Sequence, residues 1–340
     1  MSGEQHLKGW NKQTPAFTTQ TAEGRHPSQK VQEFGPGFRG NVLYNDLGIV
    51  EATGGQFRAH HLKWNPELRK KDKEAGVKQT TGMHRHDYDF HFNYVLKGWT
   101  SFVIDGVEGE IICRAGDSYF LPHRILHNEI GASDDVEILE IYGPANVATE
   151  QLEDEVGHGG RFADMTKTAD EKQYLKGWNK QTPAFTTVTA DGRHPSQQVQ
   201  EFGPGLRGAA LYADLGIAEA TSGQFRAHII KWNQEQLKKD REANVKPTTG
   251  MHRHYYDFHF NYVLKGSTSF VIDGVEGEIT CREGDSYFLP SRILHNEIGA
   301  SDDVVILEVY GPANVATEQL EDEVGQGRRF ADMTKTAGGE

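Results

Sequence analysis

The sequence has little cysteine, and its two cysteines stand far apart. Cys113 and Cys281 are the only ones in 340 residues, and neither lies in a C-x-x-C pair or at a spacing from histidine that suits a structural zinc ion. These positions exclude a disulfide framework and a cysteine-based zinc fold. We expect both thiols to be reduced and buried in strands.

Long apolar runs are also absent. No stretch approaches the roughly 20 apolar residues that span a bilayer, and the first residues lack the apolar core of a signal peptide. Basic side chains are outnumbered, with 36 Lys and Arg against 49 Asp and Glu and a net charge of −13. Such a charge repels phosphate backbones and anionic lipid. We therefore expect a cytoplasmic protein that binds neither nucleic acid nor a membrane.

The sequence does contain a duplication. The segment that begins at Leu7 returns at Leu175, a shift of 168 residues, and about 29 of the 166 aligned pairs differ, so the copies are roughly 80% identical. This period is far longer than that of solenoid repeats, so each copy should be a complete domain. We expect an N-terminal domain over residues 1–172 and a C-terminal domain over residues 173–340. The two should pack as an intrachain pseudo-dimer, and further homo-oligomers stay open.

Short apolar runs separated by glycine and proline dominate each copy. From Met83 onward, the pattern predicts strands of five to eight residues with glycine or proline between them. Asn65 and Pro66 suit the start of a short charged helix over residues 66–75, and residues 148–156 resemble an acidic amphipathic helix. The pattern predicts an all-β fold, an antiparallel sandwich or barrel with short peripheral helices.

Eight of the sixteen histidines fall into two matched sets. His84 and His86 are two residues apart at the entry to a strand, so their imidazoles should face the same side. His91 follows after a short polar segment, and His127 belongs to a later strand. The second copy repeats this spacing with His252, His254, His259 and His295. Because neutral imidazole is a preferred ligand of divalent transition metals, each set predicts a metal site.

The first three histidines resemble the first motif of the cupin superfamily. That motif runs H-x-H, three or four residues, Glu, six residues, Gly. In this chain, His84 and His86 form the H-x-H, His91 stands at the position of the glutamate, and Gly98 ends the motif.

The fourth histidine falls in a segment that resembles the second cupin motif. Gly116, Pro122 and His127 follow its order and spacing, whereas Arg124 and Gly131 replace a glycine and an asparagine. Both motifs occur in order in both copies. The resemblance implies a jelly-roll barrel, the double-stranded β-helix, in each copy.

One departure from the motif bears on the chemistry. His91 and His259 stand where the family usually has glutamate, and a histidine-only ligand set leaves the full 2+ charge on the ion. Such a centre favours substrates that bind as anions, for example enolates. The resemblance implies one divalent transition metal in each domain; Fe(II) is the expected ion, and Mn, Cu, Ni and Zn stay open.

Two further pairs of residues are candidates for a role in the pocket. Glu129 and Glu297 each follow a histidine of the second motif by two residues, so on a strand their side chains should lie on the same face as His127 and His295. Arg58 and Arg226 lie on an earlier predicted strand and could pair with an anionic substrate, with a surface salt bridge as the alternative. We treat all four as candidate catalytic residues.

The resemblance is compatible with three functions. The first is an Fe(II) dioxygenase that uses O2 to cleave a C–C bond of a small enolisable or aromatic ketone or diketone, as family members with histidine-only sites do. The second is a metal-dependent lyase, isomerase or decarboxylase that acts on a small acid or sugar, although such relatives usually keep the glutamate. The third is a non-catalytic domain that binds a small molecule. The sequence leaves open the substrate, the metal, direct ligation by His91 and His259, and whether both sites are active.

Overall fold

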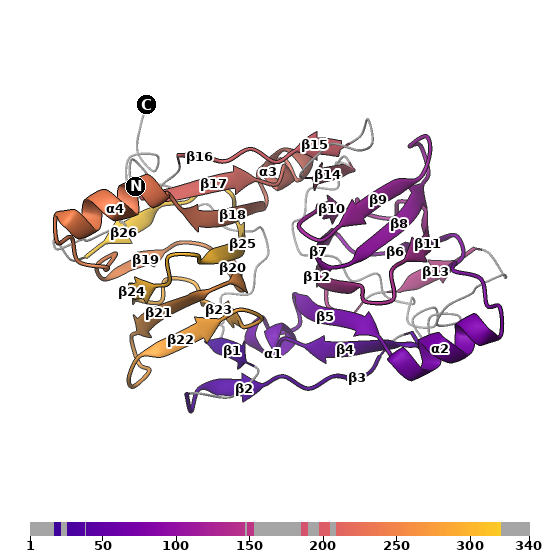
Figure 1. The fold of residues 1–340 in the computed structure, drawn as a ribbon, viewed down its shortest axis with the longest axis horizontal. Coiled ribbons are helices and arrows are strands. Elements are labelled where there is room, and N and C mark those ends of the chain that lie inside the picture. Colours follow the sequence, from indigo (N-terminus) through magenta and orange to yellow (C-terminus); the bar gives the residue numbers. More distant parts are fainter. Residues whose placement is uncertain are drawn as a thin grey trace. The chain divides into compact units, whose positions relative to one another are not determined.

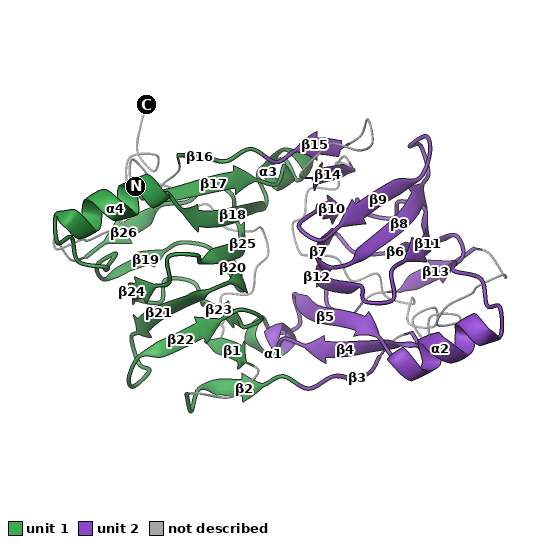
Figure 2. Ribbon diagram, viewed as in Figure 1, with its two compact units in different colours: residues 1–32, 51–53, 201–340 green, residues 33–50, 54–200 purple. Residues whose placement is uncertain are grey.

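The computed structural model describes residues 17–21, 26–37, 39–146, 148–152, 185–189, 197–204 and 209–320. The strands form two units, which Figure 2 colours separately. The first barrel comprises residues 33–50 and 54–200, and the second barrel comprises residues 1–32, 51–53 and 201–340. Each barrel is a jelly roll built from one eight-stranded and one five-stranded sheet, which confirms the predicted all-β fold (Figure 1).

The first barrel carries one half of the predicted site. Its eight-stranded sheet has the order β15 (Gln197–Val199), β14 (Thr186–Thr189), β10 (Ser118–Phe120), β7 (Phe90–Lys97), β12 (Glu137–Gly143), β5 (Arg58–Trp64), β4 (Val42–Asp46), β3 (Gly35–Pro36). Its five-stranded sheet has the order β13 (Thr149–Gln151), β6 (His84–His86), β11 (His127–Ala132), β8 (Trp99–Ile104), β9 (Ile111–Arg114). Apolar side chains from both sheets, among them Val95 and Phe102, form a shared core.

The second barrel repeats this topology. Its eight-stranded sheet has the order β16 (Gly203–Pro204), β17 (Ala210–Asp214), β18 (Arg226–Trp232), β25 (Val305–Gly311), β20 (Phe258–Lys265), β23 (Ser286–Phe288), β1 (Thr18–Thr21), β2 (Gln29–Val31). Its five-stranded sheet has the order β22 (Ile279–Arg282), β21 (Ser267–Ile272), β24 (His295–Ala300), β19 (His252–His254), β26 (Thr317–Gln319). The matching core includes Val263 and Phe270.

The described residues include four short helices. They are α1 (Ile49–Ala52), α2 (Pro66–Glu74), α3 (Ile217–Ala220) and α4 (Gln234–Glu242). α2 begins where the sequence predicts, because the Asn65 side chain accepts hydrogen bonds from two backbone N–H groups of the first turn. None of these helices is long and apolar enough to cross a bilayer.

The helix predicted over residues 148–156 is wrong in its described part. Thr149–Gln151 form strand β13, which pairs antiparallel with β6, and residues 153–156 lie outside the described residues. The edge of β6 offers backbone hydrogen-bond partners, and pairing with them overrides the local preference for a helix.

Each repeat contributes its first strands to the barrel that holds the other repeat. β1 pairs with β23 in the second barrel, and β14 pairs with β10 in the first. Thr19 Oγ1 donates a hydrogen bond to the Ser286 carbonyl oxygen at 2.8 Å, and Phe17 packs edge-on against Phe270. The division at residues 1–172 and 173–340 stays a prediction about the repeats, and the compact units depart from it at these exchanged strands.

The strand exchange predicts which barrel a mutation will affect. Phe17→Ala is expected to destabilise the second barrel by about 1–3 kcal/mol, because the phenyl ring packs against its core. Hydrogen exchange should become faster in β20 and β23 and stay unchanged in β7 and β10. Phe185→Ala is the matched control with the opposite expected pattern, because Phe185 packs against the core of the first barrel. Faster hydrogen exchange in β7 and β10 of the Phe17 variant would contradict the assignment of Phe17 to the second barrel.

Candidate metal centre

Three histidines of the first barrel converge in its interior. His84 and His86 alternate with an outward residue on β6, and β11 places His127 directly opposite His84. All three are buried, and one ring nitrogen of each lies within 4.8 Å of those of the other two. The second barrel repeats the group with His252, His254 and His295.

Hydrogen bonds fix which ring nitrogen of His84 and His127 can bind a metal. The Nδ1 of His84 is 2.8 Å from the Gly82 carbonyl oxygen, and the Nδ1 of His127 is 3.0 Å from that of Ile125. A carbonyl oxygen only accepts, so each Nδ1 carries the proton and each Nε2 keeps its lone pair. The Nε2 of His127 is buried and makes no hydrogen bond to a described residue. This donor set fits a divalent transition-metal ion.

The imidazoles of the group are neutral at physiological pH. Burial and the nearby His127 lower the pKa of His84 to about 3, and burial together with His84 lowers the pKa of His86 well below its usual value. Burial likewise lowers the pKa of His127. In the second barrel, burial and His252 lower the pKa of His295 to about 3. Neutral imidazole is the form that ligates metals.

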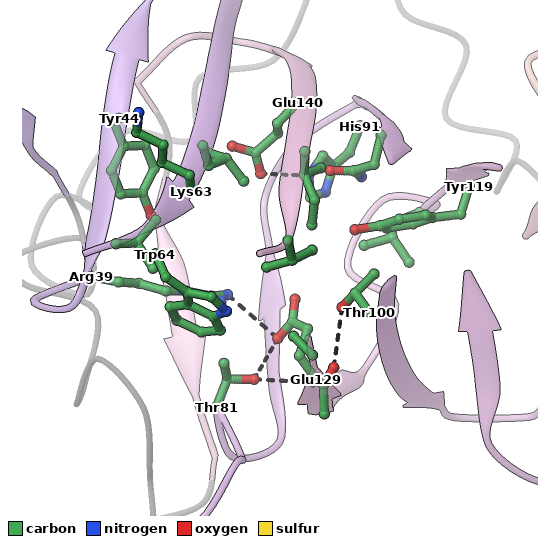
Figure 3. Close-up of a pocket in the computed structure, with 18 of the residues that line it drawn as sticks. Arg39, Tyr44, Lys63, Trp64, Thr81, His91, Thr100, Tyr119, Glu129 and Glu140 are labelled. Carbon is green, nitrogen blue, oxygen red and sulfur yellow. Dashed lines mark hydrogen bonds and ion pairs between the residues drawn. The ribbon is translucent and has the colours of Figure 1, made fainter. Parts of the chain in front are cut away.

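Glu129 lies beside the three histidines, on β11. Its carboxylate oxygens are 3.7 Å from the Nε2 of His84 and 3.9 Å from that of His127. Thr81 donates a hydrogen bond to this carboxylate, and Arg39 lies at 3.4 Å (Figure 3). Burial alone would raise the pKa of Glu129, but Arg39 and the histidines outweigh it and hold the pKa well below its usual range.

The second barrel places Glu297 in the same way. Its carboxylate is 3.6 Å from the Nε2 of His252 and accepts a hydrogen bond from Thr249. The structure therefore brings both predicted glutamates to the edge of the histidine groups. Their catalytic role stays a prediction.

His91 approaches from the other sheet and is not part of the group of three. It lies on β7, with its ring centroid 5.4 Å from that of His86, and its Nε2 is 2.9 Å from Glu140 Oε1 (Figure 3). Burial favours the protonated Glu140, but hydrogen bonds from His60 and His91 lower its pKa to about 2. Because a charged carboxylate only accepts, the Nε2 of His91 carries the proton and cannot bind a metal.

His259 of the second barrel makes the same contact. Its Nε2 is 2.8 Å from Glu308 Oε1. Direct metal ligation by His91 and His259 stays a prediction, and it would have to use Nδ1.

The arginine at the cavity is not the one that the sequence suggests. The structure places Arg58 and Arg226 at the starts of β5 and β18, and neither lines the cavities. Arg58 donates to the side-chain oxygen of Asn146 at 3.3 Å. Arg39 lines the cavity instead, and no motif marks it because it lies in the irregular segment before β4. The equivalent residue of the second repeat, Arg207, lies outside the described residues.

A cavity of about 100 Å³ adjoins the first histidine group. Charged and aromatic side chains share its wall with apolar ones, as Figure 3 shows for Arg39, Tyr44, Glu129 and Glu140. His86 also lines it, so a molecule in the cavity can reach the metal ligands. The second barrel has a smaller cavity of about 60 Å³ at the matching position.

Comparisons with known proteins agree with the fold. A family model described as a cupin domain matches residues 75–142 and 241–310. A search of curated proteins found no match.

The similar solved structures include several of oxalate decarboxylase from Bacillus subtilis. A tryptophan-to-phenylalanine variant has a TM-score of 0.52 at 12% identity and covers 85% of this chain and 77% of that one. The structure at pH 4.6 has a TM-score of 0.50 at 12% identity, with 85% and 76% covered. A structure from work on the Mn(II) centres of that enzyme has a TM-score of 0.51 at 13% identity, with 85% and 77% covered. At these identities the similarity establishes the fold.

Proposed function

Because the chain belongs to the cupin superfamily, with a cupin domain in each repeat, we propose that it is a metal-dependent enzyme for a small anionic substrate. The observation that carries the proposal is the meeting of three buried, neutral imidazoles beside Glu129. His84, His86 and His127 would hold the ion in the first barrel, and His252, His254 and His295 in the second. A bound divalent ion would polarise a substrate oxygen as a Lewis acid and, if redox-active, permit reaction with O2.

Arg39 supports an anionic substrate. Its guanidinium is mostly buried at the cavity wall, and its ion pair with Glu129 is long, at 3.4 Å. A planar guanidinium binds carboxylate and enolate oxygens well, because its N–H groups can donate two parallel hydrogen bonds. A substrate anion between Arg39 and a divalent ion held by the histidine group would therefore meet positive charge on both sides.

The first reaction that we propose is oxidative C–C cleavage of an enolisable ketone or diketone, with Fe(II) as the metal. The charged Glu129 carboxylate can take a proton from the carbon next to the carbonyl and leave an enolate, because a bound divalent ion would make that proton more acidic and so offset the low pKa of Glu129. Thr81 donates to this carboxylate and fixes its direction. Cleavage would consume one O2 and place one oxygen atom in each product. The histidine-only donor set supports this reaction.

The second candidate is decarboxylation of a small carboxylic acid. Arg39 favours it, since the natural partner of a buried guanidinium is a carboxylate. The cupin fold that the chain shares with oxalate decarboxylase is compatible with it. Decarboxylation releases CO2 without consuming O2, so the two candidates differ in a measurable co-substrate.

One set of assays separates these functions. Protein reconstituted with Fe(II) or Mn(II) is mixed with β-dicarbonyls, hydroxyaryl ketones and small carboxylic acids, and O2 uptake and CO2 release are recorded. We expect O2 uptake that matches ketone loss and disappears in the His86→Ala, His254→Ala double variant. Release of CO2 without O2 would select decarboxylation, and binding without turnover would select a non-catalytic domain. Absence of metal binding by the wild-type chain would overturn the whole proposal.

A further inference from the structure

We propose that Thr149 and Thr317 are positioning residues that select the metal-binding tautomer of His86 and His254. The inference rests on the metal centre proposed above. In each barrel, two of the three histidines donate from Nδ1 to a backbone carbonyl, which every residue type supplies. The third histidine contacts a side-chain hydroxyl instead, so its orientation depends on one particular residue.

The contact is short, buried and present in both barrels. β13 pairs antiparallel with β6 and places Thr149 directly opposite His86. Thr149 is 0% exposed, and its Oγ1 is 2.6 Å from the Nδ1 of His86. In the second barrel, Thr317 is 1% exposed and lies 2.7 Å from the Nδ1 of His254.

A hydroxyl can do what a carbonyl cannot, because it both donates and accepts. When Thr149 accepts from Nδ1–H, the Nε2 of His86 keeps the lone pair that a metal needs. When the hydroxyl rotates and donates to Nδ1, the ring proton moves to Nε2 and this nitrogen cannot ligate. Metal binding therefore requires the orientation in which the Thr149 hydroxyl accepts a hydrogen bond from Nδ1–H of His86.

The strand that carries the hydroxyl is fixed from its outer face. Glu150, the next residue on β13, accepts hydrogen bonds from Arg85 Nε at 2.8 Å and Arg124 Nη2 at 2.9 Å. The backbone N–H of Arg124 also donates to the carbonyl oxygen of His86. This network joins β13, β6 and the second-motif loop, so the hydroxyl keeps its register against His86.

The second barrel fixes β26 with a different side chain. Glu318 accepts from Arg253 at 2.8 Å and from the hydroxyl of Tyr255 at 2.7 Å, where the first barrel has Asp87 in place of the tyrosine. Two different networks therefore hold the same threonine against the same histidine. The shared element is the hydroxyl contact itself.

Thr149→Val tests the proposal, because valine keeps the shape of threonine and lacks the acceptor. The variant is made in a His254→Ala background, so that only the first barrel binds metal, and Co(II) is titrated into the full-length apo-protein. We expect a 10- to 100-fold weaker Co(II) affinity and an altered visible Co(II) spectrum. Thr149→Ser should restore both. Thr317→Val in a His86→Ala background should reproduce the effect in the second barrel.

The tautomer is measured directly by ¹⁵N NMR of histidine side chains in the apo-protein. Wild-type His86 should carry its proton on Nδ1, and Thr149→Val should shift that population toward Nε2. Should the valine variant fail to fold, Thr149→Ala removes the hydroxyl without adding bulk and carries the same expectation. Wild-type affinity and an unchanged tautomer in folded Thr149→Val would overturn the inference. Lack of Co(II) binding by the wild-type chain would instead overturn the proposed function.

Discussion

Glu129→Gln is expected to lower turnover at the first barrel by about 100- to 10,000-fold while the metal stays bound. The glutamine keeps the size of the side chain and can still accept from Thr81. It cannot take a proton, because an amide oxygen is far less basic than the carboxylate. The three imidazoles stay in place, so metal retention should be close to that of the parent.

The measurement needs a chain in which the metal site of the other barrel is inactive. Glu129→Gln is therefore combined with His254→Ala, and Glu297→Gln with His86→Ala as the reciprocal pair. Turnover is followed with the substrate that the assays above identify, and bound metal is measured in the same samples. Parent-level turnover in the glutamine variant would refute the proposed role of Glu129. Loss of the metal would reassign Glu129 as a ligand.

Removal of a histidine from one group is expected to abolish the metal site of that barrel. His86→Ala and His254→Ala should each leave one ion per chain, and the double variant should leave none, because two imidazoles alone hold a divalent ion weakly. The measurement is elemental analysis of protein purified without chelators and then dialysed. Full occupancy in the double variant would contradict the assignment of the groups.

His91→Gln is the matched control for this experiment. Its amide can still donate to Glu140, so the buried carboxylate keeps a partner. Because His91 directs Nε2–H at Glu140 and lies outside the group of three, we expect the variant to keep two ions per chain. Loss of one ion would show that His91 is a direct ligand, as the cupin motif implies.

The sequence predicts much of the fold because the relevant patterns are local. The duplication, visible from Leu7 and Leu175, predicts two like domains, and the alternation of apolar residues predicts their strands. The H-x-H spacing places His84 and His86 on one face, because side chains on a strand alternate with a period of two. Glu129 lies two residues after His127 on β11, so the same alternation places both side chains on one face of the strand.

The sequence fails where residues come from different sheets or from irregular backbone. Strand periodicity cannot tell that β7 belongs to the sheet opposite β6, and so it does not reveal that His91 faces Glu140. Arg39 has no periodic neighbours that would mark it, whereas Arg58 has the right periodicity and lies outside the cavity. Part of the segment predicted as an acidic helix forms β13 instead, because its backbone pairs with the edge of β6.

For this protein, the sequence by itself determined the duplication, the all-β character and the pairing of imidazoles on one strand, since these follow from the order of residues along the chain. Only the tertiary structure decided which three histidines lie within reach of one another, that Arg39 reaches the cavity, and that the repeats exchange their first strands. The physical reason is that these features depend on contacts between segments distant in sequence, which form through packing and backbone pairing that no local pattern encodes.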